Sequence, residues 1–342
     1  MHRTLHRVSI TLSKRREVLV KYLVTGGAGF IGSNYVRGLL TSRWGADTTA
    51  VTVLDALTYA GRRENLASTD GDPRFKFVHG SINDVNLVAE LTQDVDVLVH
   101  FAAESHVDRS ITSASEFVTT NVLGTQILLD SIKNRNKIRF LHVSTDEVYG
   151  SVPSGSSVET DLLLPNSPYA ASKASSDLVV RSYFQTYGLD CVTTRCSNNF
   201  GQYQFPEKLL PRFITNLIDG KSVPVYGDGL NVRDWLHVDD HCRGIQLAIE
   251  RGSSGEIYNI GGGTELTNIT LTRLLLNEFG LTDDQIEYVP DRLGHDRRYS
   301  VNWSKSKTEL GYEPKLRLED ELSHLVSWYK DNETWWRPIL SS

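Results

Sequence analysis

Cysteine is scarce in this chain of 342 residues, and long apolar runs are absent. The three cysteines, Cys191, Cys196 and Cys242, are too few for a disulfide framework, and none has metal-ligand spacing to a second cysteine or to a histidine pair. No stretch holds 18 consecutive apolar residues, so a membrane span is excluded. We therefore expect a cytoplasmic protein without a metal site, whose cysteines lie in or near the core.

Basic residues are fewer than acidic ones, and most clearly so when the first sixteen residues are left out. The chain has 36 Lys and Arg against 42 Asp and Glu, and five of the basic residues fall within the first sixteen positions, which contain no acid. Without those five, 31 basic residues face 42 acidic ones, a net charge of −11. No nucleic-acid partner is expected, because such a partner requires a basic face. Residues 1–17 are interpreted as a disordered extension or a misassigned start, with a targeting arm as the alternative.

The stretch from Val20 to Ser33 combines an apolar run with three glycines. It reads V-K-Y-L-V-T-G-G-A-G-F-I-G-S, with Gly26, Gly29 and Gly32 at the spacing G-x-x-G-x-x-G. This order predicts a strand, a tight turn and a helix whose N-terminus binds a pyrophosphate. An ordinary glycine loop is the alternative, because the motif alone is weak evidence.

The next predicted strand, A-V-T-V-L-D, ends on Asp55, which lies 23 residues after Gly32. An acidic side chain at this place can hold the ribose hydroxyls of NAD, whereas an NADP site would have an arginine near the extra phosphate. Arg62 and Arg63 lie beyond the turn L-T-Y-A-G and are expected to face solvent. The pattern therefore favours NAD.

Strand and helix patterns alternate along the first part of the chain. Residues 74–80, 96–103 and 138–145 read as strands, and residues 83–91 and 117–132 read as helices. This alternation predicts an α/β fold with a doubly wound parallel (Rossmann) sheet that binds ligands at the carboxyl ends of its strands. The composition changes near Asn198, so we expect an NAD-binding domain over residues 18–197. Residues 198–342 are expected to form mainly a smaller substrate-binding lobe, with some segments returning to the first domain.

Two carboxylates follow the predicted strand at 138–145, in the sequence Thr145-Asp146-Glu147. Adjacent side chains diverge, so each carboxyl can reach a different substrate atom, and burial can hold one protonated while the other is ionised. A solvated turn with a helix cap is the alternative.

Tyr169 and Lys173 lie four residues apart in S-P-Y-A-A-S-K. On a helix this spacing brings both side chains to one face, where the ammonium can stabilise a tyrosinate. A nearby lysine and the positive nicotinamide of NAD can both lower the tyrosine pKa, which makes it a candidate base. The alternative is a surface pair on an amphipathic helix.

Several further motifs occur in order: A-A-E-S-H-V-D-R-S (102–110), S-T-D-E-V-Y-G (144–150), Y-A-A-S-K (169–173), Y-G-D-G-L-N-V-R-D-W (226–235) and D-R-L-G-H-D (291–296). Together with the glycine motif they resemble the extended short-chain dehydrogenase/reductase superfamily and, within it, the dTDP-glucose 4,6-dehydratases. The resemblance runs from about Val20 to the C-terminus. The acidic pair Asp146-Glu147 is its most specific part, since epimerases of the superfamily usually lack it.

The resemblance implies a lyase that acts on dTDP-glucose with tightly bound NAD, regenerated in each turnover. Tyr169 would take the proton of the 4-hydroxyl while hydride leaves carbon 4, with Lys173 and Thr145 in support. Glu147 would then remove the carbon-5 proton as Asp146 protonates the departing 6-hydroxyl. Water would leave in this elimination, and return of the hydride to carbon 6 with reprotonation of carbon 5 would give the 4-keto-6-deoxy sugar.

The resemblance also assigns binding residues. Cofactor contacts are expected at Gly26, Gly29, Phe30, Ile31, Gly32, Asp55, Ala56, Leu57, Thr58, Ser81, Ile82, Phe101, Ala102, Ala103, Ser105, Thr120, Tyr169, Lys173 and Asn199. Substrate contacts are expected at Ser105, Thr145, Asp146, Glu147, Asn198, Lys208, Leu209, Pro224, Tyr226, Arg233, Asn268, Arg292 and His295. Lys208, Arg233 and Arg292 are the expected diphosphate clamp.

Ser81 departs from the family pattern, which commonly has an acid near the adenine, and the change is expected to cost about 1 kcal/mol of NAD binding. His106 is expected to be a structural residue of its loop and not a base.

Two other functions stay open. One is another NAD-dependent nucleotide-sugar dehydratase or epimerase that acts on a GDP- or UDP-sugar, and the other is a catalytically idle NAD-binding regulator.

A homodimer is expected from the two long helices predicted at residues 115–133 and 168–187. Both carry apolar residues on more than one side, and one face of each must cover the sheet. Pairing of the other faces with a second copy, in a four-helix interface, would bury what remains. Val180 and Phe184 are expected to lie in that interface, and the resemblance implies the same dimer.

Overall fold

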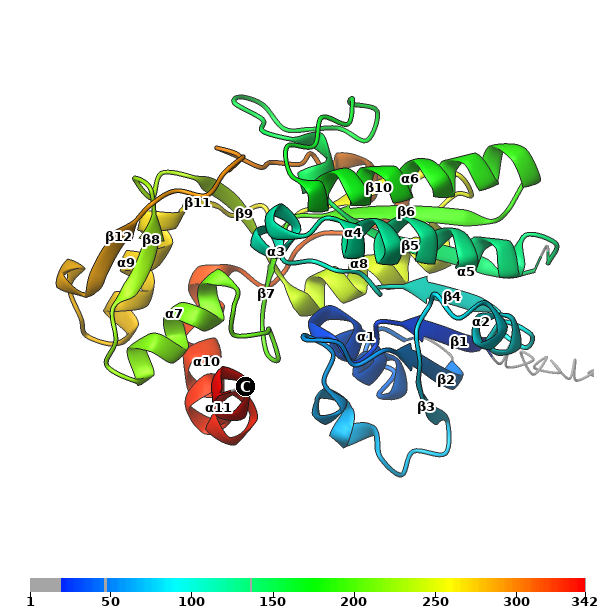
Figure 1. The fold of residues 1–342 in the computed structure, drawn as a ribbon, viewed down its shortest axis with the longest axis horizontal. Helices are drawn as coiled ribbons and strands as arrows, with labels where there is room; N and C mark the ends of the chain where they lie inside the picture. The colour runs from blue at the N-terminus through cyan, green and yellow to red at the C-terminus, as the bar shows by residue number, and fades with distance from the viewer. Residues whose placement is uncertain (1–19, 46–47, 136, 342) are drawn as a thin grey trace, which may run out of the picture.

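A seven-stranded sheet forms the centre of the larger lobe (Figure 1). The computed structural model describes residues 20–45, 48–135 and 137–341, so the predicted extension at residues 1–17 lies outside the described residues. The strand order is β10-β6-β5-β4-β1-β2-β3, and every pair is parallel. The strands span β1 Val20–Thr25, β2 Thr48–Asp55, β3 Phe75–His79, β4 Val97–His100, β5 Arg139–Thr145, β6 Cys191–Cys196 and β10 Ile257–Ile260. The predicted doubly wound sheet is confirmed.

Helices cover both faces of this sheet, as parallel strands require. Helices α1 (Phe30–Leu40) and α8 (Val238–Arg251) pack on one face, around a core that includes Val24, Val99 and Ile245. Helices α2 (Val85–Leu91), α5 (Thr125–Ile132) and α6 (Pro168–Tyr187) cover the other face, around Leu23 and Phe140. The order of the strands reverses between β1 and β4: β2 and β3 are added on one side of β1, and β4, β5 and β6 on the other. Ligands of such sheets bind at the carboxyl ends of the strands at this point, so the cleft there is the expected ligand site.

The helix predicted over residues 117–132 is less regular than its pattern indicated. It begins as α4 (Ser115–Phe117), continues through a π-helical segment at Val118–Gly124, and ends as α5. Gly124 lies against Ile82, since a Cβ at Gly124 would come within 2.4 Å of the Ile82 side chain. Such π segments often occur near functional sites.

The outer face of α6 differs from the predicted interface in one residue. Val180 is 2% exposed and belongs to the core under the sheet, so the expectation that it faces a second copy is wrong. The apolar residues that do face outward include Leu178 on α6 and Val118 and Leu123 on the π segment. Phe184 is half-buried against Gly255.

The smaller lobe contains a three-stranded and a two-stranded sheet with helices around them (Figure 1). The strands are β7 Asn198–Phe200, β8 Val223–Tyr226, β9 Val232–His237, β11 Glu265–Thr267 and β12 Ile286–Val289. The helices are α7 Leu209–Ile218, α9 Asn268–Glu278, α10 Leu318–Asp331 and α11 Glu333–Ser341. Their shared core includes Phe213, Leu275 and Trp336.

The chain crosses between the two lobes more than once. After β6 it enters the smaller lobe at β7, returns to the large sheet through α8 and β10, and then goes back at β11. The C-terminal helices also contact the larger lobe, because the Trp335 indole N–H donates to the Asn65 side chain at 2.8 Å. The cleft between the lobes is therefore bounded by segments that are far apart in sequence.

Candidate active site

Two adjoining cavities occupy the cleft at the carboxyl ends of the strands. One, of about 350 Å³, lies over the glycine turn and the ends of β2, β4 and β5. The other, of about 840 Å³, lies between the lobes. Glu147, Asn198 and Lys208 line both, so the cavities meet beside the acidic pair.

The three glycines each fill a different geometric need. Gly26 has a φ of +70°, and a Cβ there would lie 2.5 Å from the Ala102 nitrogen. A Cβ at Gly32 would lie 2.3 Å from the Gly26 carbonyl, where α1 packs on the turn. A Cβ at Gly29 would make only an ordinary contact, 3.4 Å from the Gly26 carbonyl, and this backbone lines the opening of the smaller cavity at the start of α1. That opening fits a pyrophosphate on the helix N-terminus.

Asp55 ends β2 and has a fixed carboxylate. Its two oxygens accept hydrogen bonds from the Ala28 and Leu57 amides, at 2.9 and 2.8 Å. Burial raises the pKa of Asp55, and these two amide donors oppose the rise. The side chain lines the smaller cavity, where its free lone pairs are placed to accept from ribose hydroxyls.

The residues predicted to bind the cofactor gather on the smaller cavity with one exception. Its lining includes Gly26, Gly29, Phe30, Ile31, Gly32, Asp55, Ala56, Thr58, Ser81, Ile82, Phe101, Ala102, Ala103, Ser105, Thr120, Tyr169, Lys173 and Asn199. Leu57 does not line this cavity. It has a φ of +49°, and its amide serves to hold Asp55.

Arg62, Arg63 and Ser81 lie near the expected adenosine end of the cofactor site. Arg62 lines the larger cavity with a half-buried side chain, so the expectation that it faces solvent is wrong. Arg63 is half-buried too, over the rings of Phe75 and Phe77. The Ser81 hydroxyl accepts a hydrogen bond from the Asn83 amide at 3.1 Å. The hydroxyl is therefore already engaged within its own turn.

The acidic pair sits on a short 3-10 helix, Asp146–Tyr149, directly after β5. Thr145 caps this helix, because its hydroxyl accepts from the Glu147 amide at 3.3 Å. Gly150 ends it with a φ of +75°, and a Cβ there would lie 2.2 Å from the Leu164 carbonyl. The two carboxyl groups are thus presented at the end of a buried strand.

The two carboxyl groups differ in environment. Burial raises the pKa of Asp146 well above its ordinary value, and the charges of Glu147 and Asp234 raise it further. Burial also raises the pKa of Glu147, but the charges of Lys208, Arg233 and Arg292 oppose the rise. The environment of Asp146 therefore favours its protonated form more than that of Glu147 does, and the Asp146 Oδ2 has no hydrogen-bond partner among the described residues. This is the division expected for one acid and one base.

Tyr169 and Lys173 lie in the first turns of α6 and are buried. Lys173 donates to the Val143 carbonyl at 2.8 Å, and burial lowers its pKa to about 8. Burial raises the pKa of Tyr169, and the charges of Glu147, Cys196 and Asp146 add to the rise. The expected lowering of the tyrosine pKa is thus not a property of these side chains alone, and the positive nicotinamide would have to supply it.

The residues predicted to bind substrate line the larger cavity, apart from three. Its lining includes Glu147, Asn198, Lys208, Leu209, Pro224, Tyr226, Arg233, Asn268, Arg292 and His295. Ser105, Thr145 and Asp146 line the smaller cavity instead.

The three cations of the expected clamp are held in place by different partners. The Lys208 ammonium donates to the Ser105 carbonyl at 2.9 Å, and the Arg292 guanidinium lies 2.6 Å from an Asp108 oxygen. The Arg233 guanidinium donates to the Asp296 carbonyl at 2.9 Å. Three fixed cations thus line one cavity of a chain whose net charge is −6, and their positive charge favours an anion there.

Tyr299 is a cavity residue that the sequence reasoning missed. Its ring lies 4.2 Å from the Arg233 guanidinium carbon, and its hydroxyl donates to Asp296 at 2.7 Å. Phe205 and Tyr59 are two further aromatic residues of the cleft. They line both cavities, and their rings meet edge to face. Tyr299 follows the motif at 291–296 by three residues, so extending that motif would have included it.

The remaining expectations concern groups outside this chemistry. His106 caps α3 (Val107–Thr112) by accepting from the Arg109 amide, and burial together with the Lys208 charge lowers its pKa to about 4. All three cysteines are buried and free. Within the described ranges, no group of three or more His, Cys, Asp or Glu is placed to hold a metal ion. The helices of the described part of the chain include none with the length and apolar character to span a membrane.

Comparisons with known proteins agree with this geometry. The family model for GDP-mannose 4,6 dehydratase matches residues 23–325, so the chain belongs to this family of nucleotide-sugar dehydratases. Among curated relatives, the dTDP-glucose 4,6-dehydratase of Streptomyces antibioticus is 56% identical over 93% of this chain and 94% of its own length. The enzyme of the same name from Actinoplanes sp. is 54% identical over 93% of this chain and all of its own length.

Solved structures of nucleotide-sugar enzymes are also similar to this chain. DesIV, a dTDP-glucose 4,6-dehydratase from Streptomyces venezuelae with NAD and TYD bound, superimposes with a TM-score of 0.92 at 57% identity, over 94% of this chain and 100% of DesIV. A UDP-glucuronic acid 4-epimerase from Bacillus cereus superimposes with a TM-score of 0.85 at 30% identity, over 91% of this chain and 99% of the epimerase. The chain is thus far more similar to the dehydratase than to the epimerase.

Proposed function

We propose that the chain is a dTDP-glucose 4,6-dehydratase that keeps NAD bound. The observation that carries this proposal is that the Tyr169–Lys173 pair and the Asp146–Glu147 pair line one continuous cleft beside the glycine turn. An epimerase has no use for a second acid-base pair. Relatives named dTDP-glucose 4,6-dehydratase at 54–56% identity over most of the chain support the same substrate.

The first step needs a base at the 4-hydroxyl of the sugar. NAD, when bound, supplies the hydride acceptor at carbon 4 and later returns the hydride to carbon 6. Tyr169 takes the hydroxyl proton in this proposal, and Lys173 holds positive charge behind it. Thr145, at the end of β5, orients the sugar hydroxyl toward the tyrosine.

The second step is loss of water across carbons 5 and 6. The ketone formed at carbon 4 acidifies the carbon-5 proton, which Glu147 removes as the carboxylate favoured by its three cationic neighbours. Asp146, whose pKa burial holds high, donates its proton to the departing 6-hydroxyl, which leaves as water. Glu147 then returns a proton to carbon 5, which completes the 4-keto-6-deoxy sugar. The same cations, Lys208, Arg233 and Arg292, bind the diphosphate of the substrate.

Paired variants test the division of labour. In Glu147→Gln, bound NADH should still form from dTDP-glucose, but solvent deuterium should not enter carbon 5, because an amide cannot act as the base. In Asp146→Asn, carbon-5 exchange should persist while release of water falls. Deuterium entering carbon 5 at the wild-type rate in Glu147→Gln would contradict the assignment. The alkali-induced absorbance of a 4-keto sugar, compared for dTDP-glucose and GDP-mannose, shows which of these two nucleotide sugars is the substrate.

We also propose a cytoplasmic homodimer. Leu178, Val118 and Leu123 are 58%, 54% and 45% exposed on adjoining helical segments of one subunit. An apolar face of this kind is usually covered, and a two-fold axis would place it against the same face of a second copy.

A further inference from the structure

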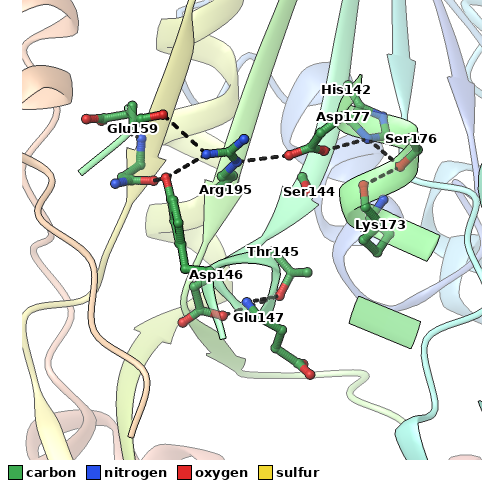
Figure 2. A network of polar contacts seen from close by, with 12 residues as sticks. His142, Ser144, Thr145, Asp146, Glu147, Glu159, Lys173, Ser176, Asp177 and Arg195 are labelled. Carbon is green, nitrogen blue, oxygen red and sulfur yellow. Dashed lines mark hydrogen bonds and ion pairs between the residues drawn. The ribbon is translucent and has the colours of Figure 1, made fainter. Parts of the chain in front are cut away.

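A chain of buried polar side chains runs behind the catalytic end of β5 (Figure 2). The Asp177 carboxylate accepts from Arg195 Nε at 2.9 Å, and Arg195 donates to the Tyr149 hydroxyl at 2.9 Å. The Tyr149 hydroxyl in turn donates to the Asn259 side-chain oxygen at 2.8 Å. All four residues are at most 5% exposed, and none lines either cavity. The catalytic chemistry described above uses none of them.

The network lies at one level of the sheet. Arg195 on β6 is in register with Ser144 on β5 and with Asn259 on β10. The next position along β5 is Thr145, which caps the helix of the acidic pair. Arg195 therefore lies beside the residue that immediately precedes Thr145 and the acidic pair.

One end of the network is fixed to α6. Tyr169, Lys173 and Asp177 follow one another at intervals of four, so they share one face of this helix. His142 Nε2 lies 3.3 Å from the Asp177 carboxylate on the other side from Arg195. Although burial raises the pKa of Asp177, His142 and Arg195 lower it to about 2, so the carboxylate is charged. The ion pair thus anchors the helix that carries the oxidation pair.

The other end is fixed to the 3-10 helix of the acidic pair. Tyr149 is the last residue of that helix, two positions after Glu147. Its ring lies 4.8 Å from the Arg195 guanidinium carbon, and its hydroxyl is held by both Arg195 and Asn259. Asn259 also donates to the Ser157 carbonyl at 3.0 Å. The hydroxyl of Tyr149 is therefore the point at which the 3-10 helix joins the network.

We infer that Asp177, Arg195 and Tyr149 are positioning residues that fix the elimination pair relative to the oxidation pair. This inference rests on the proposed function, in which one sugar must meet Tyr169 at carbon 4 and Glu147 at carbon 5 without leaving the site. A buried ion pair is a weak source of stability, because its desolvation offsets its attraction, but it does define geometry. A shift of the 3-10 helix by about 1 Å is enough to slow the step that depends on it.

The Tyr149→Phe variant tests this inference, because it keeps the packed ring and removes only the joining hydroxyl. Stopped-flow absorbance measures bound NADH formed from dTDP-glucose, and deuterium incorporation measures proton loss at carbon 5. We expect NADH formation within about twofold of wild type and carbon-5 exchange slower by about tenfold or more. Bound NADH should then accumulate during turnover, which loss of folded enzyme would not cause.

The matched control is Tyr258→Phe. Tyr258 precedes Asn259 on β10 and is equally buried, but its hydroxyl donates to Glu309 at 2.8 Å, outside the network. This variant should leave the ratio of the two rates unchanged. Arg195→Lys, which keeps the charge beside Asp177 but loses the guanidinium fork, should change the ratio in the same direction as Tyr149→Phe.

Two results would overturn the inference, and they differ from failure of the proposed function. If Tyr149→Phe lowers both rates equally, or neither, the network does not position the elimination pair. If Tyr258→Phe shifts the ratio as much as Tyr149→Phe, the effect is not specific to the network. A wild-type chain that forms no bound NADH with dTDP-glucose would instead overturn the dehydratase function itself.

Discussion

Replacing Leu178 with aspartate tests whether two copies pair through the helices that carry the catalytic tyrosine. Leu178 lies on the outer face of α6 and is 58% exposed in the single subunit. In an interface with two-fold symmetry each residue occurs twice, so one substitution alters two contacts. We expect Leu178→Asp to shift the chain from dimer to monomer.

The size of the effect follows from the exposed fraction. Full burial of a leucine side chain contributes about 1.5–3 kcal/mol, so covering 58% of it contributes about 1–1.7 kcal/mol per copy. Two copies give about 2–3.5 kcal/mol, which raises the dissociation constant of the dimer about 30- to 300-fold. Burial of the new carboxylate adds to this cost.

Sedimentation velocity at micromolar concentration measures the change, with Leu162→Asp as the control. Leu162 is 78% exposed but lies on the loop before α6, outside the proposed interface. Leu178→Asp should sediment as a monomer of 38.3 kDa while wild type and Leu162→Asp sediment as dimers. A wild-type monomer, or the same dissociation in both variants, would refute the reasoning.

Three further predictions concern the oxidation pair. Tyr169→Phe should lower the rate of bound NADH formation at least about a hundredfold, because the phenolic oxygen is the proposed base, and an unchanged single-turnover rate would exclude that role. Burial lowers the pKa of Lys173 to about 8, so kcat/KM should fall as the pH rises through about 8 and the ammonium loses its proton. Asp177→Asn should move this fall to lower pH, since the Asp177 charge raises the pKa of Lys173; a fall that stays in place or moves to higher pH would contradict this.

Local patterns were sufficient to predict much of the cofactor side of the cleft. The glycine spacing, the strand that ends on Asp55 and the Tyr169–Lys173 interval each depend on a few neighbouring residues, and the structure has the strand, turn and helix where they were expected. Leu57 had no such local signal and was assigned from the family resemblance, and it does not line the cavity.

Features that depend on distant contacts were not predictable in this way. The outward face of α6 includes Ala171, Ser175 and Leu178, while Val180 points to the core; because both faces carry apolar or small residues, periodicity alone does not separate them. The Arg195–Asn259 alignment requires the pairing of β6 with β10, which lie more than 60 residues apart. The apolar pattern of residues 117–132 likewise does not distinguish the π-helical segment at Val118–Gly124 from an α-helix.

The late return of β10 to the large sheet has a consequence for synthesis of the chain. Because β10 completes the sheet beside β6, the ribosome must make residue 260 before the larger lobe can close. A nascent chain that ends near residue 197 would expose the free edge of β6, and unpaired strand edges promote aggregation. The two lobes therefore cannot be produced as separate fragments divided at that point, nor exchanged between relatives by a single crossover there.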